Sequence, residues 1–285
     1  MNTQPTRESR YVKVARIAYD LAKRNLPRYS HPKSPHRFTQ PQLAACVLLL
    51  MYLDLTYRDM EEWLLATDQV RQVLDLTHVP DHSTLSRAFR RMRLSELTAM
   101  KDDLLKQMQV EETLIAGDST SFRLSQASAY YQTRRGRSYR EWVKGAYAVG
   151  VRSHLIVAWR SGVGSRPDFQ FLRPLKRQAA AFGCRRNGQR DWLFLADAGF
   201  DAKGVSRLDV IPPIRRNGKL TDPKRKARAD LVAQARLEGL FGQRWQVESV
   251  NSVVKRKFGD TIRSRSKRLQ RREPILKALV YNIHV

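Results

Sequence analysis

Hydrophobic residues follow two different periods along the chain, and the change falls near residue 110. From Thr39 to Met108 the apolar side chains recur every three or four residues, as in Leu43, Val47 and Leu50. This spacing is typical of helices that bury one face. Thr39 is the expected cap of the first of these helices, because it precedes the apolar run directly. The first half of the chain therefore predicts a helical domain.

One basic segment of this half, VPDHSTLSRAFRRMRLSEL at residues 79–97, is a candidate for DNA contact. We expect a turn, a helix cap at Ser83 and then a basic helix, an arrangement that resembles a helix-turn-helix. Arg87, Arg90 and Arg91 would supply cations for phosphate contacts. A helix of this kind can also serve only for internal packing, and the sequence leaves both roles open.

The second half contains short apolar runs of strand length. The hairpin is the clearest, because only three residues, 152–154, separate two of the runs. A helix is expected over residues 168–182, with its apolar side chains facing inward. The runs are TLIAGD at 113–118, GAYAVGV at 145–151, LIVAWR at 155–160, WLFLAD at 192–197 and DVIPPI at 209–214. Together they predict an α/β domain with a mixed sheet flanked by helices.

Two of the predicted strands end in an acid that a turn follows. We expect the first strand to stop at Asp118, before Ser119, and another to stop at Asp197, before Gly199. A carboxylate at the end of a strand lies at the edge of the sheet, where it is open to a ligand. Either acid alone could instead cap its turn.

The segment FGQRWQVESVNSVVKRK at residues 241–257 fits a single helix with two distinct faces. Its apolar stripe includes Val247, Val250 and Val254, and it predicts packing on a core. The opposite arc carries the polar residues Arg244, Glu248 and Lys255, together with Phe241. Glu248 could be only a solvated acid paired with Arg244, which would contribute little to stability. Trp245, beside this arc, could stack on a base or belong to the core.

The net charge of the chain indicates which class of binding partner to expect. The 285 residues include 53 Lys and Arg against 27 Asp and Glu, a formal net charge of +26. A field this positive predicts a polyanionic partner, and double-stranded DNA is the first candidate. Arg134, Arg135 and Lys144 lie among tyrosines after Asp118, as expected of a loop that follows DNA.

Other features of the composition exclude several classes of protein. Cys46 and Cys184 give neither a disulfide framework nor a zinc spacing. The longest apolar run, residues 43–53, is too short to span a bilayer. The sequence therefore predicts no membrane and no small-molecule cofactor, and a cytoplasmic protein that is nucleoid-associated when bound to DNA.

The spacing Phe241-x2-Arg244-x3-Glu248-x6-Lys255 resembles the Tyr-Arg-Glu-Lys (YREK) pattern of DDE transposases from bacterial insertion sequences. Phe241 stands where that family has Tyr, so stacking remains available and the hydroxyl is absent. With Asp118 and Asp197 the resemblance extends over roughly residues 40–285. It implies a ribonuclease H-like fold and Asp118, Asp197 and Glu248 as catalytic acids.

The resemblance also implies that these acids bind two Mg²⁺ or Mn²⁺ ions, for which carboxylate oxygens are suited. Arg244 and Lys255 would hold the phosphates of the transposon end. The expected activity is cut-and-paste transposition: metal-dependent cleavage at terminal inverted repeats and strand transfer to target DNA, by a homodimer on DNA. Two alternatives stay open, a catalytically inactive, domesticated DNA-binding protein and a ribonuclease H-like nuclease or resolvase.

The predicted domain organisation follows these segments. It comprises a basic flexible N-terminal segment at 1–38, a helical helix-turn-helix-like DNA-binding domain at 39–110, a ribonuclease H-like catalytic domain with a short insertion or none at 111–262, and a basic tail with a C-terminal helix at 263–285.

Overall fold

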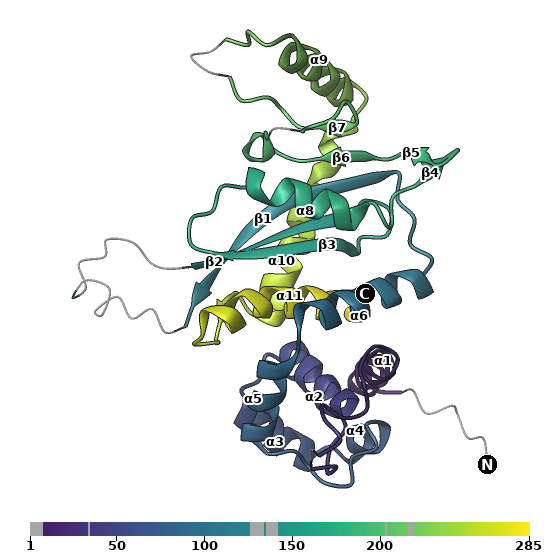
Figure 1. Ribbon diagram of the computed structural model, residues 1–285, viewed down its shortest axis with the longest axis vertical. Coiled ribbons are helices and arrows are strands. Elements are labelled where there is room, and N and C mark those ends of the chain that lie inside the picture. Colours follow the sequence, from purple (N-terminus) through teal and green to yellow (C-terminus); the bar gives the residue numbers. More distant parts are fainter. Residues whose placement is uncertain (1–7, 34, 126–133, 135–141, 203, 216–218) are drawn as a thin grey trace. The chain divides into compact units, whose positions relative to one another are not determined.

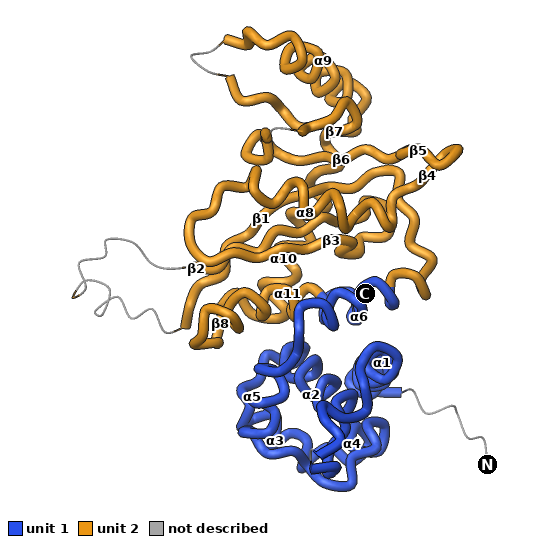
Figure 2. Tube along the Cα trace, in the orientation of Figure 1, with its two compact units in different colours: residues 1–104, 279–285 blue, residues 105–278 orange. Residues whose placement is uncertain are grey.

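The computed structural model divides the chain into two compact units (Figure 2). Unit 1 is Met1–Leu104 with Leu279–Val285, and unit 2 is Leu105–Ala278. The residues that the structure describes are 8–33, 35–125, 134, 142–202, 204–215 and 219–285. In this described part of the chain, no helix combines the length and the apolar character needed to cross a membrane.

Unit 1 is built from helices, as the helical period of the first half predicts. The capping box at the start of α2 explains why that helix begins where it does: Thr39 accepts a hydrogen bond from the Gln42 N–H, and the Gln42 side chain accepts one from the Thr39 backbone. The helices are α1 Arg10–Asn25, α2 Gln40–Tyr52, α3 Tyr57–Leu65, α4 Asp68–Val73, α5 His82–Arg91 and α6 Leu94–Gln107. The predicted cap at Thr39 is confirmed.

The basic helix α5 begins earlier than predicted. Its cap is Asp81 and not Ser83, because the Asp81 carboxylate accepts the Thr84 N–H at 2.8 Å. Ser83 instead donates its hydroxyl to the same carboxylate at 2.6 Å. These hydrogen bonds hold the pKa of Asp81 well below its usual range, so the cap is an ionised carboxylate next to the positive end of the helix dipole.

Unit 2 contains a mixed sheet in the strand order β3-β2-β1-β6-β7 (Figure 1). Strands β1, β2 and β3 are antiparallel neighbours, whereas β6, β7 and β8 run parallel to the strands they pair with. The bounds are β1 Leu114–Leu124, β2 Trp142–Gly150, β3 Ile156–Val163, β6 Leu193–Leu195, β7 Asp209–Val210 and β8 Thr261–Ile262. A separate small hairpin joins β4 Arg185–Arg186 to β5 Gln189–Arg190. The predicted β2–β3 hairpin is confirmed.

The prediction that the first strand stops at Asp118 is wrong. Strand β1 continues to Leu124, because β2 pairs with it as far as Arg123 and β8 pairs with its last two residues. What ends before Asp118 is the pairing with β6, whose last partners are Ala116 and Leu195. The β6 side of β1 is therefore open at Asp118, although the strand itself goes on.

The helices of unit 2 cover both faces of the sheet, with α8 in front of it and α10 behind it in the view of Figure 1. Residue alternation explains the division: Ala146 and Ala148 of β2 belong to the core under α8, and Tyr147 between them donates its hydroxyl to the Pro274 carbonyl of α11 at 2.9 Å. The bounds of the helices are α8 Phe169–Ala179, α9 Pro223–Leu237, α10 Trp245–Phe258 and α11 Lys267–His284. The predicted helix over 168–182 and its inward-facing residues are confirmed.

The predicted single helix at 241–257 is nearly correct. Its first turn, η2 Phe241–Arg244, is a 3₁₀ helix, and α10 proper begins at Trp245. The far end of α10 is fixed by Lys277, which is 1% exposed and donates its ammonium to the Gly259 carbonyl at 2.7 Å. A buried cation at a helix C-terminus satisfies carbonyls that the helix leaves unpaired.

The two units do not follow the predicted boundaries at 38, 110 and 262. Helix α1 buries Val12, Ala15 and Leu21 within unit 1, and α11 has residues in both units. How the chain divides into independently folding domains stays a prediction.

Candidate active site

Asp118 and Asp197 come from neighbouring parallel strands at the same level of the sheet. Asp118 follows Ala116 by two residues, and Asp197 follows its partner Leu195 by two residues. The pairing itself ends at Ala116 and Leu195, and Asp197 is still extended, with φ −76° and ψ 176°. Neighbouring strands lie about 4.8 Å apart, which brings the two backbones close together. Just beyond, the chain turns into η1 Ala198–Phe200, and the Asp197 carboxylate accepts the Gly199 N–H at 3.0 Å.

Glu248 reaches this place from α10. Val247, Val250, Val254 and Phe258 are buried on one side of the helix, as the apolar stripe predicts, and Glu248 lies on the other side with its side chain 51% exposed. Its Oε1 atom is 2.7 Å from the Arg244 guanidinium. The sequence therefore predicts the ion pair between Glu248 and Arg244 correctly. The pair does not by itself show whether Glu248 has a catalytic function.

Asn251, one turn beyond Glu248, forms a hydrogen bond between α10 and β1. Its amide nitrogen donates to Asp118 Oδ2 at 2.9 Å. The residue is 6% exposed, and its own Oδ1 atom is buried without a hydrogen-bond partner. An unsatisfied buried carbonyl oxygen costs free energy unless a ligand uses it.

The electrostatics of Asp118 show which charges surround it. The pKa of its carboxyl is raised from 3.8 to about 6, mainly by burial, and a hydrogen bond from the Ser119 backbone opposes this rise. The charges of Asp197 and Glu248 contribute to the rise, whereas the charge of Arg244 opposes it. Asp118 is therefore close enough to two other acids and one cation to respond to their charges. A raised carboxyl pKa next to other acids is common where a functional site binds a cation.

The donor chemistry suits a hard divalent cation, but the side chains are not arranged closely around one. Asp118, Asp197 and Glu248 offer carboxylate oxygens, and Asn251 offers its unpartnered amide oxygen. Among the described residues, however, no three His, Cys, Asp or Glu side chains converge closely enough to hold a metal ion. In this arrangement the Glu248 carboxylate is paired with Arg244.

The predicted DNA-contact residues occupy several elements. Arg87, Arg90 and Arg91 lie on α5 of unit 1, and Arg87 donates to the Ser83 hydroxyl at 2.8 Å. Arg134 is exposed, and Arg135 lies outside the described residues. Their contacts with DNA stay predictions.

In unit 2, the Lys255 ammonium lies 5.8 Å from the centre of the buried Phe122 ring, and the Arg236 guanidinium lies 5.1 Å from that of Phe241. Trp245 is 54% exposed, so its alternative role as a core residue is wrong. The roles of Lys255 and Phe241 in DNA binding stay predictions.

Lys144, also predicted to bind DNA, is a residue of β2 whose ammonium contacts the Asp168 carboxylate at 2.8 Å. Ser119, next to Asp118, donates to the same carboxylate. The sequence gives no indication of a role for Asp168, because its contact with Ser119 joins residues 49 positions apart. Asn251 does have a signal, since a residue three places after Glu248 on a helix lies on a neighbouring face.

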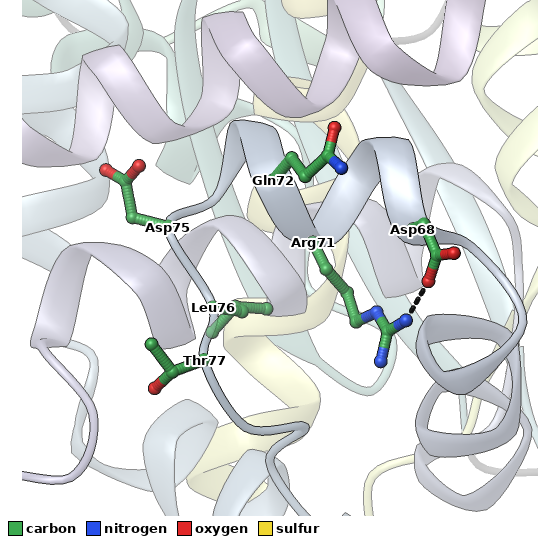
Figure 3. Close-up of a pocket in the computed structure, with 6 residues that line it drawn as sticks. All are labelled: Asp68, Arg71, Gln72, Asp75, Leu76 and Thr77. Carbon is green, nitrogen blue, oxygen red and sulfur yellow. Dashed lines mark hydrogen bonds and ion pairs between the residues drawn. The ribbon is translucent and has the colours of Figure 1, made fainter.

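Unit 1 also has a surface hollow of about 510 Å³ near α4 (Figure 3). The charged side chains that line it already have partners: Arg71 points to Asp68 and pairs with it, and Asp75 accepts the Tyr19 hydroxyl at 3.0 Å. No predicted site residue lines this hollow.

Two aspartates thus lie where two parallel strands part, and a helix that carries Arg244's partner Glu248 and Lys255 packs nearby. Comparison with family models identifies the class of protein: residues 110–283 match the model described as Transposase DDE domain. This match covers more than half of the chain, and the protein belongs to that transposase family. The predicted resemblance is confirmed at this level. Neither the search of curated proteins nor the search of solved structures found a match.

Proposed function

We propose that this protein is a cut-and-paste transposase whose catalytic acids are Asp118, Asp197 and Glu248. The observation that carries the proposal is the placement of Asp118. Its pKa is raised by burial and by the charges of Asp197 and Glu248, which come from a neighbouring strand and from the facing helix. We assign the sheet to a ribonuclease H-like fold, because an antiparallel β3-β2-β1 set is extended by strands parallel to β1.

In this proposal Mg²⁺ or Mn²⁺, when bound, supplies activation of a water or a 3′-hydroxyl and stabilises the leaving oxygen of a phosphodiester. The protein supplies the ligands and their positions. The Asn251 amide donates to Asp118 Oδ2 and so helps to fix the orientation of that carboxylate. Asp197 is held by the Gly199 N–H in the same manner.

Arg244 gives the site a way to respond to DNA. It is paired with Glu248 at 2.7 Å, and 26% of its side chain is exposed. A phosphate forms stronger, bidentate hydrogen bonds with a guanidinium than an exposed carboxylate does with its i,i+4 neighbour. Binding of the transposon end would therefore draw Arg244 away and release Glu248 toward Asp118.

The basic surfaces would then position the duplex. Arg87, Arg90 and Arg91 on α5 belong to a helix-turn-helix-like element that would bind the terminal repeats, and Lys255 would contact the phosphates next to Glu248. Cutting and joining both ends of an element requires two active sites, so we propose a homodimer on DNA. The protein would act in the cytoplasm, on the nucleoid.

The test uses a supercoiled plasmid that carries the DNA flanking the gene, with Mg²⁺ or Mn²⁺ added. We expect nicking at the ends of inverted repeats, and its loss in Asp118→Asn, Asp197→Asn and Glu248→Gln. Asp191→Asn is the matched control, because Asp191 is an exposed acid of the same unit that pairs with Arg186. Binding of the repeats without nicking would favour the inactive DNA-binding protein. Undiminished nicking by Glu248→Gln would exclude the role assigned to that residue.

A further inference from the structure

Asp168, directly before α8, holds its carboxylate in an unusual way for a residue in that position. An acid that precedes a helix normally accepts an N–H from the first turn. Asp168 makes no such side-chain bond. Its Oδ1 atom instead accepts the Ser119 hydroxyl at 2.6 Å and the Lys144 ammonium at 2.8 Å. The carboxylate is therefore directed at the sheet and does not stabilise its own helix.

These contacts join three elements at the level of the candidate active site. Ser119 is the residue after Asp118 on β1, and Lys144 belongs to β2. Lys144 also donates to the Arg166 carbonyl at 3.0 Å, which fixes the segment that leads into α8. Side chains alternate along a strand, so Ser119 points to the α8 face while Asp118 points to the α10 face. The network thus supports Asp118 from the opposite face of the sheet.

Asp168 also approaches the turn that carries Asp197. A Cβ atom placed on Gly199 would lie 3.1 Å from Asp197 Oδ1 and 3.2 Å from Asp168 Oδ2. Both carboxylates therefore lie against the same glycine, from which Asp197 accepts its N–H. Asp168 therefore contacts β1, the strand of Asp118, and also lies beside the turn that follows Asp197.

We propose that Asp168 is a positioning residue of the active site, with Lys144 as its counter-charge. Through Ser119 it sets the β1 backbone at Asp118, and against Gly199 it sets the turn at Asp197, so that the two acids keep a fixed separation. The inference rests on the proposed function, in which Asp118 and Asp197 are catalytic. It assigns Lys144 a structural task in place of contact with DNA.

The first experiment compares Asp168→Asn with the control Asp191→Asn, which removes the same charge from an exposed place in the same unit. Nicking is measured at saturating plasmid, DNA affinity is measured without metal, and Mn²⁺ affinity is measured by electron paramagnetic resonance. Loss of a residue that orients a ligand typically costs about 10- to 100-fold in metal affinity or activity. We expect losses of this size in nicking rate and Mn²⁺ affinity for Asp168→Asn, with DNA affinity changed less than about twofold.

A second pair of variants tests the contact without altering any charge. Ser119→Ala should reduce nicking, and Ser119→Thr, which keeps the hydroxyl, should restore most of it. Ser119→Ala should add little to Asp168→Asn, because both remove one contact. If Asp168→Asn fails to fold, the serine pair decides the question.

The outcomes separate this inference from the function on which it depends. If Asp118→Asn nicks like the wild type, the proposed function fails. If Asp118→Asn is inactive while Asp168→Asn and Ser119→Ala match Asp191→Asn, only the positioning role is overturned. A loss of DNA affinity in Asp168→Asn equal to its loss of rate would also overturn it.

Discussion

Replacing Asp118 by Asn should make the protein more stable at neutral pH while abolishing its activity. Burial raises the pKa of this carboxyl from 3.8 to about 6, so ionising it in the folded protein is unfavourable. Because a tenfold change in an ionisation constant corresponds to about 1.4 kcal/mol, the charged form of Asp118 costs roughly 3 kcal/mol more in the folded protein than in the unfolded chain. Asparagine has nearly the same shape and carries no charge. The variant should therefore avoid a penalty that the wild type bears at pH 8.

The pH dependence of this difference follows from proton linkage. Between about pH 4 and pH 6 the folded protein keeps a proton on Asp118 that the unfolded chain has released. The free energy of unfolding of the wild type therefore falls, through this group, as the pH rises across that window. Above about pH 6 the penalty is fully present, and below about pH 4 it is absent. Asp118→Asn should gain up to about 3 kcal/mol over the wild type at pH 8, and almost nothing at pH 4.

Urea unfolding followed by tryptophan fluorescence measures the effect, because four of the five tryptophans lie in unit 2. Asp191→Asn serves as the control and should unfold like the wild type at both pH values. Adding Mg²⁺ should stabilise the wild type by about 2.7 kcal/mol at 100 times its dissociation constant, and the variant by much less. A variant that is destabilised at pH 8, or that differs from the wild type equally at both pH values, would refute the reasoning.

Three further predictions concern the surroundings of the site. Gly117→Ala should lose about 1–3 kcal/mol, because its Cβ would lie 2.5 Å from the Phe194 ring; thermal unfolding should show partial recovery when Phe194→Leu is added. Asn251→Ala should lower the nicking rate while DNA affinity in a gel-shift assay stays unchanged, because the amide holds Asp118. Glu112→Ala should cost about 2–5 kcal/mol in urea unfolding, because this buried carboxylate accepts two backbone N–H groups of the β2–β3 turn.

Asp118 and Asp197 illustrate what local sequence features can predict and what they cannot. Asp197 is predictable because an apolar run stops there and a glycine follows, and both features are local. The same pattern also identifies Asp118 as a candidate, but part of the reason is wrong. Strand β1 does not end at Asp118 and continues to Leu124. The pairing with β6, which ends at Ala116, is what opens the site. Such pairing depends on residues nearly 80 positions away, and local periodicity carries no information about it.

The sequence by itself determined the periods of the helices and strands, the basic charge and the spacing of Arg244, Glu248 and Lys255. These features depend on residues close together in the chain. Only the tertiary structure decided that Asn251 donates a hydrogen bond to Asp118 and that Asp168 accepts the Ser119 hydroxyl on the other face of the sheet. These contacts depend on sheet register and helix packing, which bring distant residues within hydrogen-bonding distance only after the chain has folded.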